Sequence, residues 1–404
     1  HAKVRTAVVV ALAMCISCNE ANSASADDYD FRVFCCGVFG GAYSASLTSF
    51  FLAEQSDPFN FISMDAGTSY DCLKTGADNG QLDVILDDVS RQSDNRYTKI
   101  GYFRKQQLNG FLITHSHLDH NGGLIVSSAD DSFAAKPIIS RPLVIDEFVD
   151  SVFQPPLWPP AAVFGYYGVS INENNTEFTA MDSSDVSGHP TFNVKMRTFP
   201  LAHTAASTAF LICNLGETAC TLFFGDTGPD AVEAVDYLYN VWMAVAGYVA
   251  DGTLNTIFIE CSYISSRADD LLFGHLTPRW LLQELSVLAQ LVAAQTGSQN
   301  VDGALNGLYV VVTHIKPTFD VDQDTEETRA LIEDELTNPA NATYASMGVE
   351  FIIPYETDII YMKRGKATII TSNSADLESV AVRLFVQYRI FVSLCVLCTL
   401  LVLY

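Results

Sequence analysis

A short segment, THSHLDH at residues 114–120, holds three of the eight histidines of the chain. His115 and His117 are two positions apart, so on an extended backbone they project to the same side and can hold one metal ion. Asp119 and His120 follow in the turn and can face a second ion about 3.5–4 Å away, a spacing typical of two-metal hydrolytic sites. Imidazole and carboxylate ligands suit zinc or manganese. The spacing predicts a dinuclear centre rather than a solvated polar turn.

The other histidines are spread along the chain, but most share one kind of position. A single histidine at the end of a strand-like run, or in a tight turn, is usually a structural residue. Six of the eight occupy such positions, which favours a shared site; they are His115, His117, His120, His203, His275 and His314. His189 lies in a polar loop and is predicted to be a surface residue.

Seven short runs rich in β-branched and aromatic residues predict the strands that position these side chains. They lie at residues 59–67, 108–117, 192–203, 208–216, 220–228, 254–262 and 308–317. Most end on His, Asp or Glu, which places an ionisable side chain at the rim of a sheet. Residues 276–295 read as a helix, with Pro278 near its start. Because residues 27–371 contain no repeat or linker, we expect one layered α/β domain with its helices outside.

Several segments resemble a known family. HSHLDHNGGLIVSSA (115–129) after a strand looks like the metal motif of the metallo-β-lactamase fold, and it resembles the signature of class II cyclic-nucleotide phosphodiesterases. FFGDTGPD, FIECSY, LFGHLTP and VVTHIKP follow in the order of that family, and VFQPPLWPP is similar to its Phe-Asn…Trp-Pro stretch. The resemblance covers roughly residues 33–371 and includes segments specific to the phosphodiesterases. It implies a four-layer αββα metallo-β-lactamase-like sandwich in a single domain.

The resemblance also implies ligands for two divalent ions, zinc or alternatively manganese. Those of the first ion would be His115, His117 and His203. Those of the second would be Asp119, which is also counted as catalytic, His120 and His314. Asp226 would bridge the two ions. Asp65, in SMDAGT, looks like the family's aspartate that orients a ligand histidine, with a turn-capping aspartate as the alternative.

The implied activity is hydrolysis of 3′,5′-cyclic nucleotides, cAMP, cGMP or both, to nucleoside 5′-monophosphates by a hydroxide bound to both ions. Water bound to zinc can have a pKa of about 7, which provides a nucleophile at neutral pH. His275 is proposed as general acid or phosphate contact, with Glu260 orienting it. The alternative is that His275 caps the helix that begins near Thr277. Lys316 either contacts phosphate or is a solvated lysine.

Composition narrows the classes of partner. The chain has 22 Lys and Arg against 47 Asp and Glu, and its net charge of −25 argues against a nucleic-acid partner. Bound metal ions would instead supply the positive field for a small phosphate substrate. Two alternatives stay open: another hydrolase of the same fold, and an inactive extracellular protein that binds cyclic nucleotides. The complete ligand set favours the enzyme, and the sequence predicts no oligomeric state.

Both ends of the sequence resemble processing signals. Residues 1–26 combine two basic residues, an apolar run and Ala24-Ser25-Ala26, which predicts a secretory signal peptide. Residues 372–404 combine small residues, a polar spacer and an apolar tail. They predict a signal exchanged for a glycolipid anchor, or alternatively a short membrane anchor that stays in place. Residues 27–371 would then form a phosphodiesterase domain that is secreted or held at the cell surface.

Cysteine usage agrees with export. The even number of cysteines between the two ends suits an oxidising compartment; they are Cys35, Cys36, Cys72, Cys213, Cys220 and Cys261. Cys213 and Cys220 flank a hairpin-like turn and are either paired or buried free thiols. Adjacent cysteines such as Cys35 and Cys36 rarely bridge each other. Sequons at Asn174 and Asn341 predict glycan acceptors in polar loops.

Overall fold

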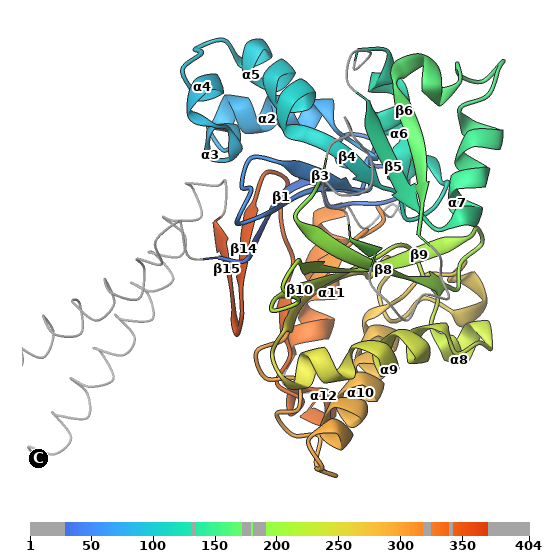
Figure 1. Ribbon diagram of the computed structural model, residues 1–404. Helices are drawn as coiled ribbons and strands as arrows, with labels where there is room; N and C mark the ends of the chain where they lie inside the picture. The colour runs from blue at the N-terminus through green and yellow to red at the C-terminus, as the bar shows by residue number, and fades with distance from the viewer. Residues whose placement is uncertain are drawn as a thin grey trace, which may run out of the picture.

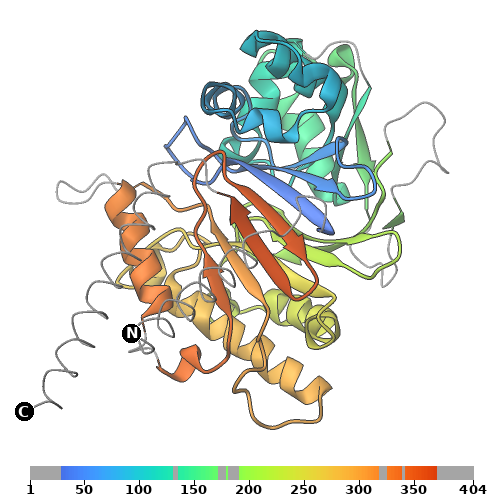
Figure 2. The ribbon, with the colours of Figure 1, turned by 90° about the vertical axis from the view of Figure 1, so that its left-hand side faces the viewer.

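The computed structural model describes residues 29–130, 135–171, 179–180, 191–317, 325–338 and 342–370. Two β-sheets pack face to face, and helices cover the outer face of each sheet (Figure 1). Figure 2, turned by 90°, shows the β14–β15 hairpin in red, with one helical layer above it and the other below. The structure therefore confirms the four-layer αββα arrangement in one domain.

The first sheet has eight strands in the order β15-β14-β1-β2-β3-β4-β5-β6. Their bounds are β1 (Phe31–Gly37), β2 (Ser49–Glu54), β3 (Phe61–Met64), β4 (Leu108–Leu112), β5 (Lys136–Ser140), β6 (Tyr166–Ser170), β14 (Ile359–Lys363) and β15 (Lys366–Ile370). Strands β3 to β6 pair in parallel. Parallel neighbours need long crossover connections, and the helices between these strands supply them.

The second sheet has seven strands in the order β13-β12-β11-β10-β9-β8-β7. Their bounds are β7 (Thr179–Ala180), β8 (Val194–Leu201), β9 (Ser207–Asn214), β10 (Cys220–Phe224), β11 (Leu254–Glu260), β12 (Tyr309–Thr313) and β13 (Glu350–Ile352). Strands β8, β9 and β10 form an antiparallel meander, and β10 to β13 run parallel. All seven runs predicted as strands are strands in the structure.

Helices follow the strands that they cover. On the first sheet they are α2 (Tyr70–Asn79), α3 (Leu82–Ile85), α4 (Asp88–Arg91), α5 (Arg96–Tyr102), α6 (Leu118–Ser127) and α7 (Pro142–Glu147). On the second they are α8 (Asp230–Glu233), α9 (Tyr237–Ala250), α10 (Pro278–Gln295), α11 (Thr325–Thr337) and α12 (Ala342–Ala345). Short helical turns are η1 (Phe103–Gln107), η2 (Ser128–Asp130), η3 (Phe148–Val152), η4 (Ala161–Phe164) and η5 (Asp269–Leu271). The helix predicted at 276–295 is α10, which starts at Pro278.

The strand period of two divides the first sheet between two apolar clusters. In β1, Val33 and Cys35 face the second sheet, whereas Phe34 and Cys36 face the helices. Every residue of β1 is buried as a result. Strands covered on both faces read as continuous apolar runs, which hides their alternation in the sequence.

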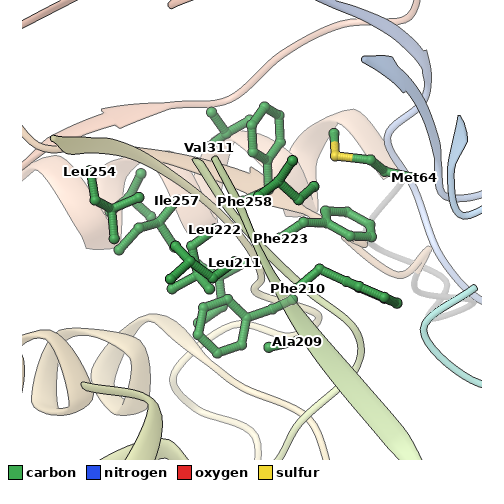
Figure 3. Packing of buried hydrophobic residues seen from close by; sticks show 14 of the residues in the cluster. Met64, Ala209, Phe210, Leu211, Leu222, Phe223, Leu254, Ile257, Phe258 and Val311 are labelled. Carbon is green, nitrogen blue, oxygen red and sulfur yellow. The ribbon is translucent and has the colours of Figure 1, made fainter. Parts of the chain in front are cut away.

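Aromatic side chains fill the space between the sheets. The ring of Phe50 on β2 lies 6.2 Å from that of Phe223 and 5.6 Å from that of Phe258, both on the second sheet. Figure 3 shows Met64, also from the first sheet, beside the cluster that contains Phe210, Phe223 and Phe258. Each fully buried phenylalanine contributes about 1.5–3 kcal/mol, so this layer holds the two sheets together.

Two disulfides add covalent links. Cys213 and Cys220 pair across the β9–β10 turn, which confirms the hairpin prediction. Cys36 pairs with Cys72 and ties β1 to α2. Cys35, its neighbour, faces the opposite side of the strand and stays a buried free thiol, as does Cys261.

Some predictions concern residues that the structure does not describe. They are the signal peptide at 1–26, the tail at 372–404, His189, and the sequons at Asn174 and Asn341. Within the described ranges, no helix combines the length and apolar character that crossing a membrane requires.

Candidate metal centre

The site residues predicted from the sequence meet where strands of both sheets end. The segment after β4 carries the histidine motif of residues 115–120, and it belongs to the first sheet. The second sheet supplies the rest: His203 follows β8, Asp226 follows β10, Glu260 ends β11 and His314 follows β12. The carboxyl ends of parallel strands share one edge of a sheet, which is the usual position of a ligand site in α/β folds. The two sheets therefore contribute to one centre.

His115, His117 and His203 form the first group of candidate ligands, with one ring nitrogen from each within 4.8 Å of the others. Nε2 of His203 lies 3.2 Å from Nδ1 of His117. Nδ1 of His203 donates to the carbonyl oxygen of Gly274 at 2.9 Å, which places the proton on Nδ1 and leaves Nε2 free to bind an ion. The geometry suits one metal ion held by three imidazoles.

Asp119, His120 and His314 form the second group. Nε2 of His314 lies 3.2 Å from Oδ2 of Asp119. Asp226 lies between the two groups: its carboxylate oxygens are 3.2 Å from Nε2 of His120 and 3.3 Å from Nε2 of His314. The same carboxylate is 3.8 Å from Nε2 of His115. This is the position that a bridging ligand would need.

Asp65 contacts His120, a member of the second group of candidate ligands. Oδ2 of Asp65 is 2.7 Å from Nδ1 of His120, and Thr114 donates to the same carboxylate through its backbone N–H at 2.8 Å and its hydroxyl at 2.9 Å. A carboxylate on Nδ1 fixes the ring and directs Nε2 toward the centre. Asp65 is completely buried and contacts a candidate ligand, so its role exceeds the capping of a turn.

The donor set fits divalent metal ions. Nε2 of His115 and Nε2 of His120 are buried and make no hydrogen bond with any of the described residues. A buried polar atom without a partner costs about 1–3 kcal/mol, and a bound ion would remove that cost. Imidazole nitrogens together with carboxylate oxygens are the donors that zinc and manganese prefer.

The pKa shifts of His115, His203 and Asp226 agree with metal binding, whereas at His120 the effect of burial is outweighed by the charges of Asp226 and Asp65, which raise the pKa well above its ordinary value. Burial lowers the pKa of His203 to about 4, and burial together with neighbouring imidazoles lowers that of His115 well below its ordinary value. Burial alone would raise the pKa of Asp226, but His120, His314 and His275 hold it well below its usual range. Neutral imidazoles and an ionised carboxylate are the forms that bind metals.

A second chain of contacts passes through His275. Nδ1 of His275 donates to Oε1 of Glu260 at 2.8 Å, and its Nε2 lies 2.7 Å from Nζ of Lys316. Nδ1 is also 3.6 Å from Oδ2 of Asp226, which puts the ring at the border of the metal centre. Thr277 occupies the cap position of α10, so His275 does not cap that helix.

His275 also lies close enough to other candidate ligands to share a metal ion with them. Its ring nitrogens could share an ion with His203 and Asp226, or with Glu260 and His314. Both ring nitrogens already have close protein partners in Glu260 and Lys316. This separates His275 from His115, whose Nε2 has none among the described residues.

The sequence did not reveal three contributors. A Cβ at Gly40 would lie 2.2 Å from Nε2 of His314, so this position requires glycine. The N–H of Gly41 donates to Oδ2 of Asp119 at 2.8 Å. Ser262 donates to Glu260 at 2.6 Å and lies 3.0 Å from Nδ1 of His314. The glycine pair in the loop after β1, Gly40-Gly41, is a sequence signal that could have indicated close backbone approach.

A cavity of about 620 Å³ opens beside the first group of ligands. Its wall includes His203, Glu233 and Tyr237 from the second half of the chain, and Leu143 and Glu147 from α7. Ligand cavities in proteins typically measure about 300–1,000 Å³. A small molecule bound at the metal centre therefore has room to extend past His203.

Comparison with known proteins agrees with this site. Residues 38–356 match the family model of class II cAMP phosphodiesterases. A 3′,5′-cyclic-nucleotide phosphodiesterase of Aliivibrio fischeri is 31% identical, with 86% of this chain and 97% of that protein covered. A probable 3′,5′-cyclic-nucleotide phosphodiesterase of Yersinia pestis is 33% identical, with 81% of this chain and 88% of that protein covered.

A solved structure shows the same fold. The crystal structure of unliganded yeast PDE1 superposes with a TM-score of 0.68 at 23% identity, and the match covers 83% of this chain and all of that one, 100%. The family match spans the segments that carry the histidine motif, Asp226, Glu260 and His314. The chain therefore belongs to the class II cAMP phosphodiesterases, a family of hydrolases.

Proposed function

We propose that the chain hydrolyses 3′,5′-cyclic nucleotides, cAMP, cGMP or both, to nucleoside 5′-monophosphates with two divalent metal ions. The observation that carries this proposal is the meeting of seven candidate ligands from separate strand ends in groups whose donor atoms lie within 4.8 Å. The names of the relatives in Aliivibrio fischeri and Yersinia pestis support the substrate class. An inactive binding protein would not need this complete ligand set.

The ligand assignment follows the two groups. His115, His117 and His203 would hold one ion, and Asp119, His120 and His314 the other. Asp226 would contact both ions. Zinc fits this mixture of imidazole and carboxylate, and manganese is the alternative. When bound, the two ions lower the pKa of a water molecule to make a nucleophile and offset the charge of the phosphodiester.

Side chains of the protein would protonate the 3′ oxygen as it leaves the phosphorus. Glu260 holds Nδ1 of His275, so the ring can present only Nε2 to a substrate. Through Nε2 His275 would contact the phosphate, or pass to the departing 3′ oxygen a proton that the ammonium of Lys316 supplies to it. Lys316, whose Nζ lies 2.7 Å from that Nε2, adds a positive charge next to the phosphate position. Glu260 itself is held by the N–H groups of Thr227 and Leu276, at 2.9 and 3.2 Å.

The proposal is tested by metal analysis and turnover of the purified chain. We expect about two equivalents of zinc or manganese per chain and conversion of cAMP or cGMP to the 5′-monophosphate. Asp226→Ala should abolish turnover because it removes the one carboxylate that lies between both groups. Wild-type rates in this variant would refute the bridging role, and a metal-free chain that still hydrolyses cyclic nucleotides would refute the metal dependence.

We also propose that the chain acts outside the reducing cytosol, secreted or attached to a cell surface. The two disulfides of the described residues support this location, because disulfides persist mainly in oxidising compartments. The processing signals predicted at residues 1–26 and 372–404 are consistent with it. Cell fractionation with an antibody against the chain would test the location, and a cytosolic pool with reduced Cys36 and Cys72 would contradict it.

A further inference from the structure

Glu233 lies beside the metal centre and has no role in the assignment above. It is the last residue of α8, and its side chain is half-buried. A Cβ at Gly228 would lie 2.3 Å from Oε1 of Glu233, so the carboxylate rests directly against the backbone of Gly228, two residues after Asp226. Glycine at position 228 thus allows Glu233 to reach the border of the centre.

The carboxylate of Glu233 accepts no hydrogen bond from the described residues. Burial raises its pKa, and the charge of His275 lowers it in part. Partial burial of a carboxylate is unfavourable unless a donor compensates for the lost water. A ligand that brings a hydroxyl or an N–H to this position would provide that donor.

Glu233 faces the cavity of about 620 Å³ that also includes His203 in its wall. Because His203 belongs to the metal centre and to the cavity, a phosphate bound at the centre would have the rest of its molecule in this cavity. Leu143 and Tyr237 give the outer part of the cavity an apolar surface for a base. The carboxylate of Glu233 also lies in the cavity wall, next to Gly228.

We infer, on the basis of the proposed function, that Glu233 accepts a hydrogen bond from the ribose 2′-hydroxyl of the cyclic nucleotide. In a 3′,5′-cyclic nucleotide the ribose is fused to the phosphate ring, so it must lie next to the metal centre, with the base farther out. The 2′-hydroxyl is the only free hydroxyl of that ribose. Acidic side chains bind ribose hydroxyls in the same way in dinucleotide-binding folds. Glu233 therefore selects ribonucleotides over 2′-deoxyribonucleotides, whichever base they carry.

The test compares two substrates, cAMP and 2′-deoxy-cAMP, on the metal-loaded full chain. Glu233→Ala should lower kcat/KM for cAMP about 10- to 100-fold, the effect of losing a hydrogen bond to a charged group. The same variant should change kcat/KM for 2′-deoxy-cAMP less than about 3-fold, since that substrate cannot make the contact. Glu233→Gln keeps an oxygen acceptor without the charge and should fall between Glu233→Ala and wild type.

Asp236→Ala is the matched control. Asp236 is exposed, lies three positions after Glu233 and is not part of the cavity wall, so its removal changes the net charge equally without touching the ligand. Both substrates should react at wild-type rates in this variant. Equal losses for both substrates in Glu233→Ala, or no loss for cAMP, would overturn the inference while the proposed function stands. A wild-type chain that turns over neither substrate would refute the proposed function, and the ribose contact with it.

Discussion

At the scale of single residues, two imidazoles of the metal centre, those of His120 and His203, are each held by a partner on the nitrogen that points away from it. Asp65 binds Nδ1 of His120, and the carbonyl of Gly274 accepts from Nδ1 of His203. Each partner fixes the tautomer and leaves Nε2 as the only nitrogen that can bind an ion. The backing contacts therefore decide which ring atoms face the centre, before any ion is bound.

His275 provides the test of catalysis at this scale. His275→Ala should lower kcat about 10²- to 10⁴-fold, the usual contribution of a general acid or base, because Nε2 can no longer reach the leaving oxygen. The metal content should stay close to that of the wild type, since both ring nitrogens of His275 contact protein groups. Rate measurements paired with metal analysis check this prediction. A parallel loss of metal and activity would instead make His275 a ligand.

The sequence predicted the candidate metal ligands better than the contacts of the residues around them. The spacing of His115 and His117, and the resemblance around Asp226 and His314, identified residues that the structure brings together. It left Lys316 undecided, because the contact with His275 joins residues 41 positions apart through the direction of a side chain. No spacing rule reports such a direction.

At the scale of the elements, strands were predictable where one ionisable residue marked their end. The strand β11 reads LNTIFIE and finishes on Glu260, and β12 leads directly to His314. Strand β1 has no such residue at its end. Its two faces pack against different apolar clusters, so its sequence does not alternate between apolar and polar residues. Burial on both faces therefore removed the pattern on which the prediction depended.

Helix α10 carries a buried acid whose titration can be measured. Burial raises the pKa of Glu284 from 4.5 to about 7, the charge of Asp230 adds to the rise, and the indole N–H of Trp242 offsets it in part. Below pH 4.5 both the folded and the unfolded chain are protonated at this position. Between pH 4.5 and about 7 only the unfolded chain has lost the proton, so stability falls as the pH rises.

Glu284→Gln should remove that part of the pH dependence. The free energy of unfolding of the variant, compared with that of the wild type, should be up to about 3 kcal/mol more favourable to the folded state at pH 8 than at pH 5. Each pKa unit corresponds to about 1.4 kcal/mol. Urea unfolding at the two pH values measures this difference. Asp236→Asn, an exposed acid, serves as the control and should keep the wild-type profile. An identical pH slope in Glu284→Gln and wild type would contradict the assignment to Glu284.

At the scale of the whole molecule, two disulfides close loops of different length and so reduce the conformational entropy of the unfolded chain. The Cys36–Cys72 disulfide joins residues 36 positions apart, and the Cys213–Cys220 disulfide joins residues 7 positions apart. Loop-closure entropy assigns about 3.8 kcal/mol to the longer loop and about 2.4 kcal/mol to the shorter one. The longer loop also anchors α2, which covers the first sheet.

Removing each disulfide separately tests this difference. The double variant Cys36→Ala/Cys72→Ala should lose about 1.4 kcal/mol more free energy of unfolding than Cys213→Ala/Cys220→Ala. All four cysteines are buried, so the cost of the lost side-chain volume is similar in both variants. Urea denaturation under non-reducing conditions measures the two losses. A larger loss for the hairpin pair would show that local strand pairing, rather than loop entropy, dominates.

The distribution of ligands over both sheets has a consequence for the order of assembly. The histidine motif at 115–120 leaves the ribosome long before His203 and Asp226, and His314 comes last of all. With the proposed ligands, neither ion would acquire its full coordination until the second sheet has docked on the first. Full metal coordination would therefore follow the docking of the two sheets, and a nascent chain halted before residue 314 would lack His314, a candidate ligand of the second ion.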